Sequence, residues 1–127
     1  MSDNKEIKIL VVEDNEKIRK LLCNILKNVG YSKISEAENG EIAWDKLSKD
    51  KFDLVLTDWM MPIMDGLELL KKIRTSDGHF KGVPVLMITA SDSPENIKAA
   101  AQWKISGYII KPFSVKTIVQ KIQQSVS

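Results

Sequence analysis

Features that mark several other classes of protein are scarce in this 127-residue sequence. Its one cysteine, Cys23, cannot form a disulfide within the chain, so a reducing compartment is expected. No apolar run approaches the roughly 18 residues that are needed to cross a bilayer. Residues 1–6 are polar, whereas a signal peptide would have an apolar middle region. We therefore expect a cytoplasmic protein that does not insert into a membrane.

An excess of charge of one sign is also missing. The chain has 19 Lys and Arg residues against 17 Asp and Glu residues, a formal net charge of +2. A domain built to coat nucleic acid would be strongly basic, so direct nucleic-acid binding is not expected. We find no repeat, low-complexity segment or Pro/Gly/Ser linker, and we expect residues 1–127 to form one globular domain.

Apolar runs alternate with segments of helical spacing along the chain. From Ile18 to Val29, apolar residues recur at i, i+3, i+4 and i+7, which predicts a helix that ends at Gly30. Strands are expected at residues 7–12, 33–37, 52–57, 83–88 and 108–110. Helices are expected at residues 18–29, 42–47, 66–73, 94–104 and 115–122.

This alternation predicts an α/β fold with a parallel five-stranded sheet and right-handed crossovers. The second strand is partly polar and the fifth is short, so both suit the edges of the sheet. The doubly wound order 2-1-3-4-5 places them there. In such sheets ligands bind beyond the carboxyl ends of the strands where the strand order reverses, which here means the ends of the first and third strands.

Acidic residues stand at those two strand ends. Glu13 and Asp14 follow the 7–12 strand, and Asp58 follows the 52–57 strand. Two like charges about 4 Å apart repel by about 4 kcal/mol at an effective dielectric constant near 20, so three carboxylates should take up a proton or bind a cation. Oxygen ligands with room for water and a phosphate favour Mg²⁺ over Ca²⁺.

The last two strands end in a hydroxyl, Thr89, and an ammonium group, Lys111. Alone, each of these residues is more often a helix cap or a solvated side chain. Together with the carboxylates they form a set that suits a transferring phosphoryl group. The four strand ends therefore predict a phosphoryl-transfer site.

At these residues the sequence resembles the receiver domains of two-component response regulators, which have a flavodoxin-like (βα)₅ fold. The resemblance covers about residues 7–125, and its run 64–71 is most similar to the chemotaxis regulators of that family. Four motifs carry it in order: Val11-Val12-Glu13-Asp14-Asn15, Leu56-Thr57-Asp58-Trp59-Met60-Met61-Pro62-Ile63-Met64-Asp65-Gly66, Ile88-Thr89-Ala90 and Tyr108-Ile109-Ile110-Lys111-Pro112-Phe113.

The resemblance implies that Asp58 is the phosphoacceptor, attacking a kinase phosphohistidine to form an aspartyl phosphate. Asp14, Asp58 and the backbone carbonyl of Met60 would bind Mg²⁺ directly, and Glu13 would act through water. Lys111 would pair with a phosphoryl oxygen.

The resemblance also implies a switch. The Thr89 hydroxyl would move onto the phosphoryl group, and Tyr108 would move from a solvent-facing to a packed position. The peptide bond between Lys111 and Pro112 would be cis. The target-binding surface would comprise Ile97, Ala101, Tyr108, Ile110 and Lys121.

We therefore expect a monomeric, stand-alone response regulator that is phosphorylated by a histidine kinase and binds a protein target. Chemotaxis is the first candidate process and the flagellar motor switch protein the first candidate target. Such a protein catalyses its own phosphorylation and dephosphorylation but is not a metabolic enzyme. A phosphorelay intermediate, or another single-domain receiver that does not act on the motor, is the alternative.

Two rivals from other classes fit less well. A phosphatase of the haloacid-dehalogenase type also uses an Asp nucleophile, but it needs a second Asp two residues later, where Met60 stands. A flavodoxin-type flavin carrier needs a glycine- and hydroxyl-rich loop after the first strand to bind phosphate. Glu13 and Asp14 would repel that phosphate.

Overall fold

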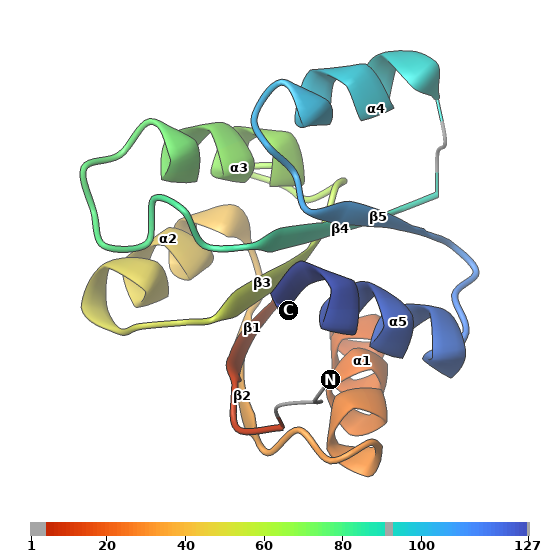
Figure 1. Cartoon of the computed structure of the whole chain (residues 1–127). Helices are drawn as coiled ribbons and strands as arrows, with labels where there is room; N and C mark the ends of the chain where they lie inside the picture. The colour runs from red at the N-terminus through yellow and green to blue at the C-terminus, as the bar shows by residue number, and fades with distance from the viewer. Residues whose placement is uncertain (1–4, 91–92, 127) are drawn as a thin grey trace.

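The computed structural model describes residues 5–90 and 93–126. Its strands are β1 (Lys8–Val12), β2 (Lys33–Ala37), β3 (Leu54–Asp58), β4 (Val85–Thr89) and β5 (Gly107–Ile110). Its helices are α1 (Glu16–Asn28), α2 (Gly40–Lys49), α3 (Gly66–Arg74), α4 (Pro94–Ala101) and α5 (Val115–Val126). All strand pairs are parallel and the order is β2-β1-β3-β4-β5, which confirms the predicted fold (Figure 1).

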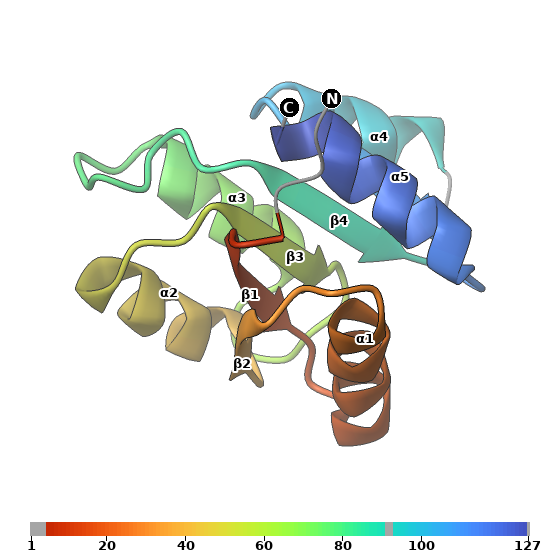
Figure 2. The same ribbon diagram turned by 60° about the horizontal axis from the view of Figure 1, so that its bottom comes forward.

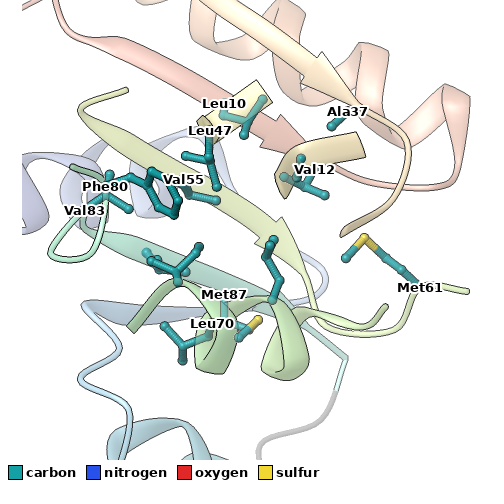
Figure 3. Packing of buried hydrophobic residues seen from close by; sticks show 14 of the residues in the cluster. Leu10, Val12, Ala37, Leu47, Val55, Met61, Leu70, Phe80, Val83 and Met87 are labelled. Carbon is teal, nitrogen blue, oxygen red and sulfur yellow. The ribbon is translucent and has the colours of Figure 1, made fainter. Parts of the chain in front are cut away.

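Helices cover both faces of the sheet. Helices α1 and α5 lie on one face, and α2, α3 and α4 lie on the other (Figure 2). Side chains alternate between the faces along each strand, so Ile9 and Val11 pack toward α1 and α5 while Leu10 and Val12 pack toward α2 and α3. Figure 3 shows the core on the side of α2 and α3, in which Leu10 lies near Leu47.

Burial on both faces explains why the central strands are almost wholly apolar. Every residue of β3 and β4 is buried. Among the residues that the structure describes, no helix has both the length and the apolar character needed to cross a membrane.

The fourth helix is shorter than expected, because α4 ends at Ala101 and not near residue 104. The backbone N–H groups of Trp103 and Lys104 donate to the carbonyls of Ala100 and Ala101, which forms a tight turn in place of further α-helix. Lys104 then has a φ of 58°, in the left-handed region that ends a helix. The apolar pattern continues through Trp103 and gave no sign of this turn.

Gly66 sets how closely the start of α3 can approach the end of β3. A Cβ atom at this position would lie 2.5 Å from the Asp58 carbonyl oxygen and 2.6 Å from the Met87 sulfur. We predict that Gly66→Ala lowers the free energy of unfolding by about 1–3 kcal/mol, because the added methyl group would force the β3 backbone or the buried Met87 side chain to shift. Urea unfolding measures the loss.

Gly82→Ala is the matched control. No atom of the described residues lies within 4 Å of a Cβ atom at Gly82, so this substitution should change the unfolding free energy by less than about 0.5 kcal/mol. Equal stability of the Gly66→Ala protein and the unsubstituted protein would contradict the close approach.

Candidate functional site: an acidic cluster at the carboxyl edge of the sheet

Three carboxylates meet where β1 and β3 end. The two strands are neighbours, with Val12 opposite Thr57, so the residues that follow them project from the same edge. One carboxylate oxygen each from Glu13, Asp14 and Asp58 lies within 4.8 Å of the others. The meeting of these side chains, which the sequence predicted, is observed.

Glu13 is the most unusual of the three. Its side chain is buried, and Oε2 accepts from the Asn15 backbone N–H at 3.1 Å. Oε1 has no hydrogen-bond partner among the residues that the structure describes. Burial raises the pKa of the Glu13 carboxyl from 4.5 to about 7, and the nearby Asp58 charge adds to the rise. A buried carboxylate oxygen without a donor is suited to bind a cation or a water that a cation holds.

Lys111 brings the one ammonium group that pairs with this cluster in the described part of the chain. Its Nζ lies 3.3 Å from Asp58 Oδ1 and 3.8 Å from Glu13 Oε1. Its backbone N–H donates to the Thr89 carbonyl at 2.8 Å, which fixes the end of β5 beside the end of β4. The following Lys111–Pro112 peptide is cis. One ammonium cannot neutralise three carboxylates, so the site favours a further cation.

Arg19 holds the acidic loop in place, and the sequence analysis missed it. Its Nη1 donates to the Glu13 carbonyl at 2.8 Å, and its Nε donates to Glu36 Oε1 at 3.0 Å. This guanidinium ties the end of β1 to β2 and α1. Arg19 stands on a helix among other basic residues, so nothing in the sequence distinguishes it from a solvated side chain.

Trp59 links Asp58 to β5. Its backbone N–H donates to Asp58 Oδ1 at 2.9 Å, and its ring stacks on Tyr108 with centroids 6.4 Å apart. We expected Tyr108 to face solvent before phosphorylation, but its ring is partly buried and its hydroxyl donates to the Asn96 carbonyl at 3.0 Å. The packed position covers the Trp59 ring and gives the hydroxyl an acceptor on α4.

Thr89 and Met60 lie at the same edge of the sheet. Thr89 is buried at the end of β4, whose Ile88 lies opposite Asp58 on β3. Met60 follows Trp59 directly, and its side chain is 75% exposed. Its side chain therefore projects toward solvent beside the carboxylates.

The residues expected to bind a target occur on three neighbouring elements. Helices α4 and α5 lie on opposite faces of the sheet beside its edge strand β5 (Figures 1 and 2). Three of these residues are exposed: Ile97, Ala101 and Ile110. The other two, Tyr108 and Lys121, are partly buried.

The buried Glu13 charge predicts how stability depends on pH. The folded protein holds the Glu13 proton up to about pH 7, whereas the unfolded chain releases it near pH 4.5, so the free energy of unfolding should fall across this window as pH rises. Glu13→Gln removes the charge. Without divalent metal at pH 8, the variant should be about 1–3 kcal/mol more stable than the parent in urea unfolding.

Glu16→Gln is the control, because Glu16 is an exposed acid on α1. It should leave the pH dependence unchanged. A Glu13→Gln protein that is less stable than its parent at pH 8, or that keeps the parent's pH slope, would show that Glu13 is not a destabilising buried charge.

Comparisons with known proteins agree with this geometry. The family model "Response regulator receiver domain" matches residues 9–123. The chain is 45% identical over 121 residues to the chemotaxis protein CheY-3 of Vibrio cholerae, covering 95% of this chain and 92% of that protein. It is 38% identical over 118 residues to the chemotaxis protein CheY of Pseudomonas aeruginosa, covering 93% and 94% of the two chains.

Solved structures are similar as well. The V. cholerae chemotaxis protein CheY4 superposes with a TM-score of 0.88 at 32% identity, covering 94% of this chain and 98% of that one. A receiver domain of a P. aeruginosa sensor histidine kinase, with a magnesium ion in its active-site cleft, superposes with a TM-score of 0.85 at 24% identity, covering 95% and 98%. The matched family, the motif order and the site geometry agree, and this chain belongs to the response regulator receiver domain family.

Proposed function

We propose that this response regulator accepts a phosphoryl group from a histidine kinase on Asp58, with Mg²⁺ bound, and then binds a protein target in chemotaxis. The observation that carries the proposal is the contact of Lys111 Nζ with Asp58 Oδ1 at 3.3 Å, inside a cluster of three carboxylates. This arrangement pairs a nucleophilic carboxylate with a fixed positive charge beside it.

In the proposed reaction a carboxylate oxygen of Asp58 attacks the phosphorus of a phosphohistidine. A phosphorus–oxygen bond forms, the phosphorus–nitrogen bond breaks, and the histidine of the kinase leaves with the electron pair. The Trp59 N–H and Lys111 both contact Oδ1, which orients the carboxylate and leaves Oδ2 to attack. The Lys111 ammonium offsets the charge that develops on the phosphoryl oxygens.

The residues present fit Mg²⁺. The donors are all oxygens, and the buried Glu13 Oε1 lacks a hydrogen-bond partner within the described residues. Asp14, Asp58 and the carbonyl of Met60 would hold the ion, with Glu13 acting through water. When bound, Mg²⁺ supplies positive charge that lets an anionic phosphodonor approach three carboxylates.

Phosphorylation would be transmitted through Thr89 and Tyr108. The Thr89 hydroxyl stands on the strand next to Asp58 and would bond a phosphoryl oxygen. Tyr108 lies one strand further, with its ring on Trp59 and its hydroxyl on α4. In α4 only Ala100 is fully buried, so a second packing of this helix costs little and its population can shift.

The target-binding surface would then be the neighbouring faces of α4, β5 and α5, comprising Ile97, Ala101, Tyr108, Ile110 and Lys121. The likeness to chemotaxis proteins supports chemotaxis as the process and the flagellar motor switch protein as the first target to test. The proposed protein acts in the cytoplasm as a monomer and catalyses its own phosphorylation and dephosphorylation.

Asp58→Asn should abolish phosphorylation. Incubation of the parent protein with Mg²⁺ and acetyl phosphate should add one base-labile phosphoryl group, because an aspartyl phosphate is an acyl phosphate. The variant lacks the nucleophilic carboxylate and should add none. Intact-mass spectrometry measures the adduct.

Asp77→Asn, which changes an exposed acid in the loop after α3, should be phosphorylated like the parent. Removing Mg²⁺ with a chelator should abolish the adduct in the parent as well. An Asp58→Asn protein that is modified as fully as its parent would overturn the assignment of the phosphoacceptor.

Ile110→Asp should weaken binding of the phosphorylated protein to the flagellar motor switch protein by about tenfold or more, because it places a charge in the apolar centre of the surface. Ile110 is 39% exposed. Phosphorylation of Asp58 should be unchanged. Fluorescence anisotropy with a labelled switch-protein peptide measures the affinity.

Leu21→Asp is a matched control, since Leu21 is a 50% exposed apolar residue on α1, away from α4 and β5. It should leave the affinity unchanged. If the parent phosphoprotein does not bind the switch protein while Asp58 is fully phosphorylated, the motor is not the target and the phosphoacceptor assignment stands.

A further inference from the structure

A pocket lies at the opposite edge of the sheet from the carboxylates. Its volume is about 650 Å³, within the range of roughly 300–1,000 Å³ that is usual for small-molecule sites. Pro84, just before β4, and Ser106, just before β5, are part of its wall. The pocket therefore lies at the amino-terminal ends of these strands, whereas the acidic site lies at the carboxyl ends.

The lining of this pocket is basic. It includes Arg74, Lys81 and Lys104, and no Asp or Glu among the described residues lines it. The indole of Trp103, which is partly buried, supplies aromatic surface. A further ammonium group, Lys71 Nζ, lies 5.9 Å from the centroid of the Trp103 ring.

Arg74 is a half-buried cation without a carboxylate partner among the described residues. Its guanidinium donates to four backbone carbonyls, those of Lys81, Val83, Trp103 and Lys104, at 2.7–3.0 Å. Carbonyl dipoles satisfy its hydrogen bonds and offset part of its charge, but they bring no negative formal charge, and burial lowers the pKa of the guanidinium from its usual value. An anion in the adjacent pocket would compensate this charge.

The same four bonds make the pocket pre-organised. They tie the end of α3 to the loop before β4 and to the turn after α4, which are the two loops that form the walls. In that turn Lys104 has a φ of 58°, a conformation that glycine adopts more readily than lysine. A lysine is thus held at the rim at a cost in backbone strain.

We propose that this pocket binds a small aromatic phosphate, of the class to which nucleoside monophosphates belong. The aromatic ring would stack on the Trp103 indole, as bases do on aromatic side chains. The phosphate, with nearly two negative charges at neutral pH, would face Arg74, Lys81 and Lys104. Because the described lining contains three cationic side chains and no Asp or Glu, the pocket should bind a doubly charged phosphate more tightly than a singly charged carboxylate.

The test is a titration of the ¹⁵N-labelled full chain with adenosine monophosphate, followed by NMR. Amide signals of Gly82, Lys104 and Ser106 and the Trp103 indole N–H should shift saturably. Adenosine and inorganic phosphate, which each offer half of the ligand, should bind about tenfold more weakly or worse. No saturable shifts, or shifts confined to Asp58 and Lys111, would overturn the proposal.

Substitutions at Gly82 should leave the fold intact, because no neighbour in the described part of the chain lies within 4 Å of a Cβ atom at this wall position. Gly82→Glu should weaken adenosine monophosphate binding about tenfold or more, because it adds a negative charge beside the phosphate. Gly82→Gln, with the same size and no charge, should bind within about threefold of the parent. Equal binding by the Gln and Glu variants would contradict an anion site.

Discussion

The mutual repulsion of three carboxylates at one edge of a parallel sheet governs this structure. Glu13, Asp14 and Asp58 lie within 4.8 Å of one another, and Lys111 supplies one positive charge against them. Repulsion of this kind, of order 4 kcal/mol per close pair at an effective dielectric constant near 20, would separate side chains on flexible loops. Here Asp58 ends β3, and Glu13 and Asp14 directly follow β1. Both strands are buried in the core, which holds the charges together.

The site is therefore assembled at the expense of stability. Glu13 is buried, one of its oxygens lacks a hydrogen-bond partner within residues 5–90 and 93–126, and its raised pKa reflects that cost. Arg19 and the Asn15 backbone N–H hold the loop after β1 in spite of it. A folded protein that tolerates such a cluster is poised to bind a cation, because the cation relieves repulsion that the unfolded chain does not have.

The connection from this edge to the proposed output surface is short. The Trp59 backbone contacts the Asp58 carboxylate, its ring stacks on Tyr108, and the Tyr108 hydroxyl bonds to a carbonyl of α4. The helix at the end of this chain of contacts buries little apolar surface. These contacts support the proposal that a change of charge at Asp58 biases the packing of α4.

The sequence predicted those features that depend on periodicity along the chain. The apolar runs and the polar or short edge strands predicted the sheet order. The residues that follow each run predicted that Glu13, Asp14, Asp58 and Lys111 lie close together. It did not predict features that depend on which distant side chains pack together. The Arg19 contact with Glu13, the inward position of Tyr108 and the Arg74 pocket all join segments that no local pattern relates. The early end of α4 was missed because its apolar pattern continues into the turn.

Paramagnetic line broadening by Mn²⁺, which takes the same oxygen ligands as Mg²⁺, tests the central claim most directly. On titration into the ¹⁵N-labelled protein, the amide signals of residues 13–15 and 58–60 should disappear first, and excess Mg²⁺ should restore them. If these signals stay sharp while signals elsewhere broaden, the three carboxylates do not form a cation site.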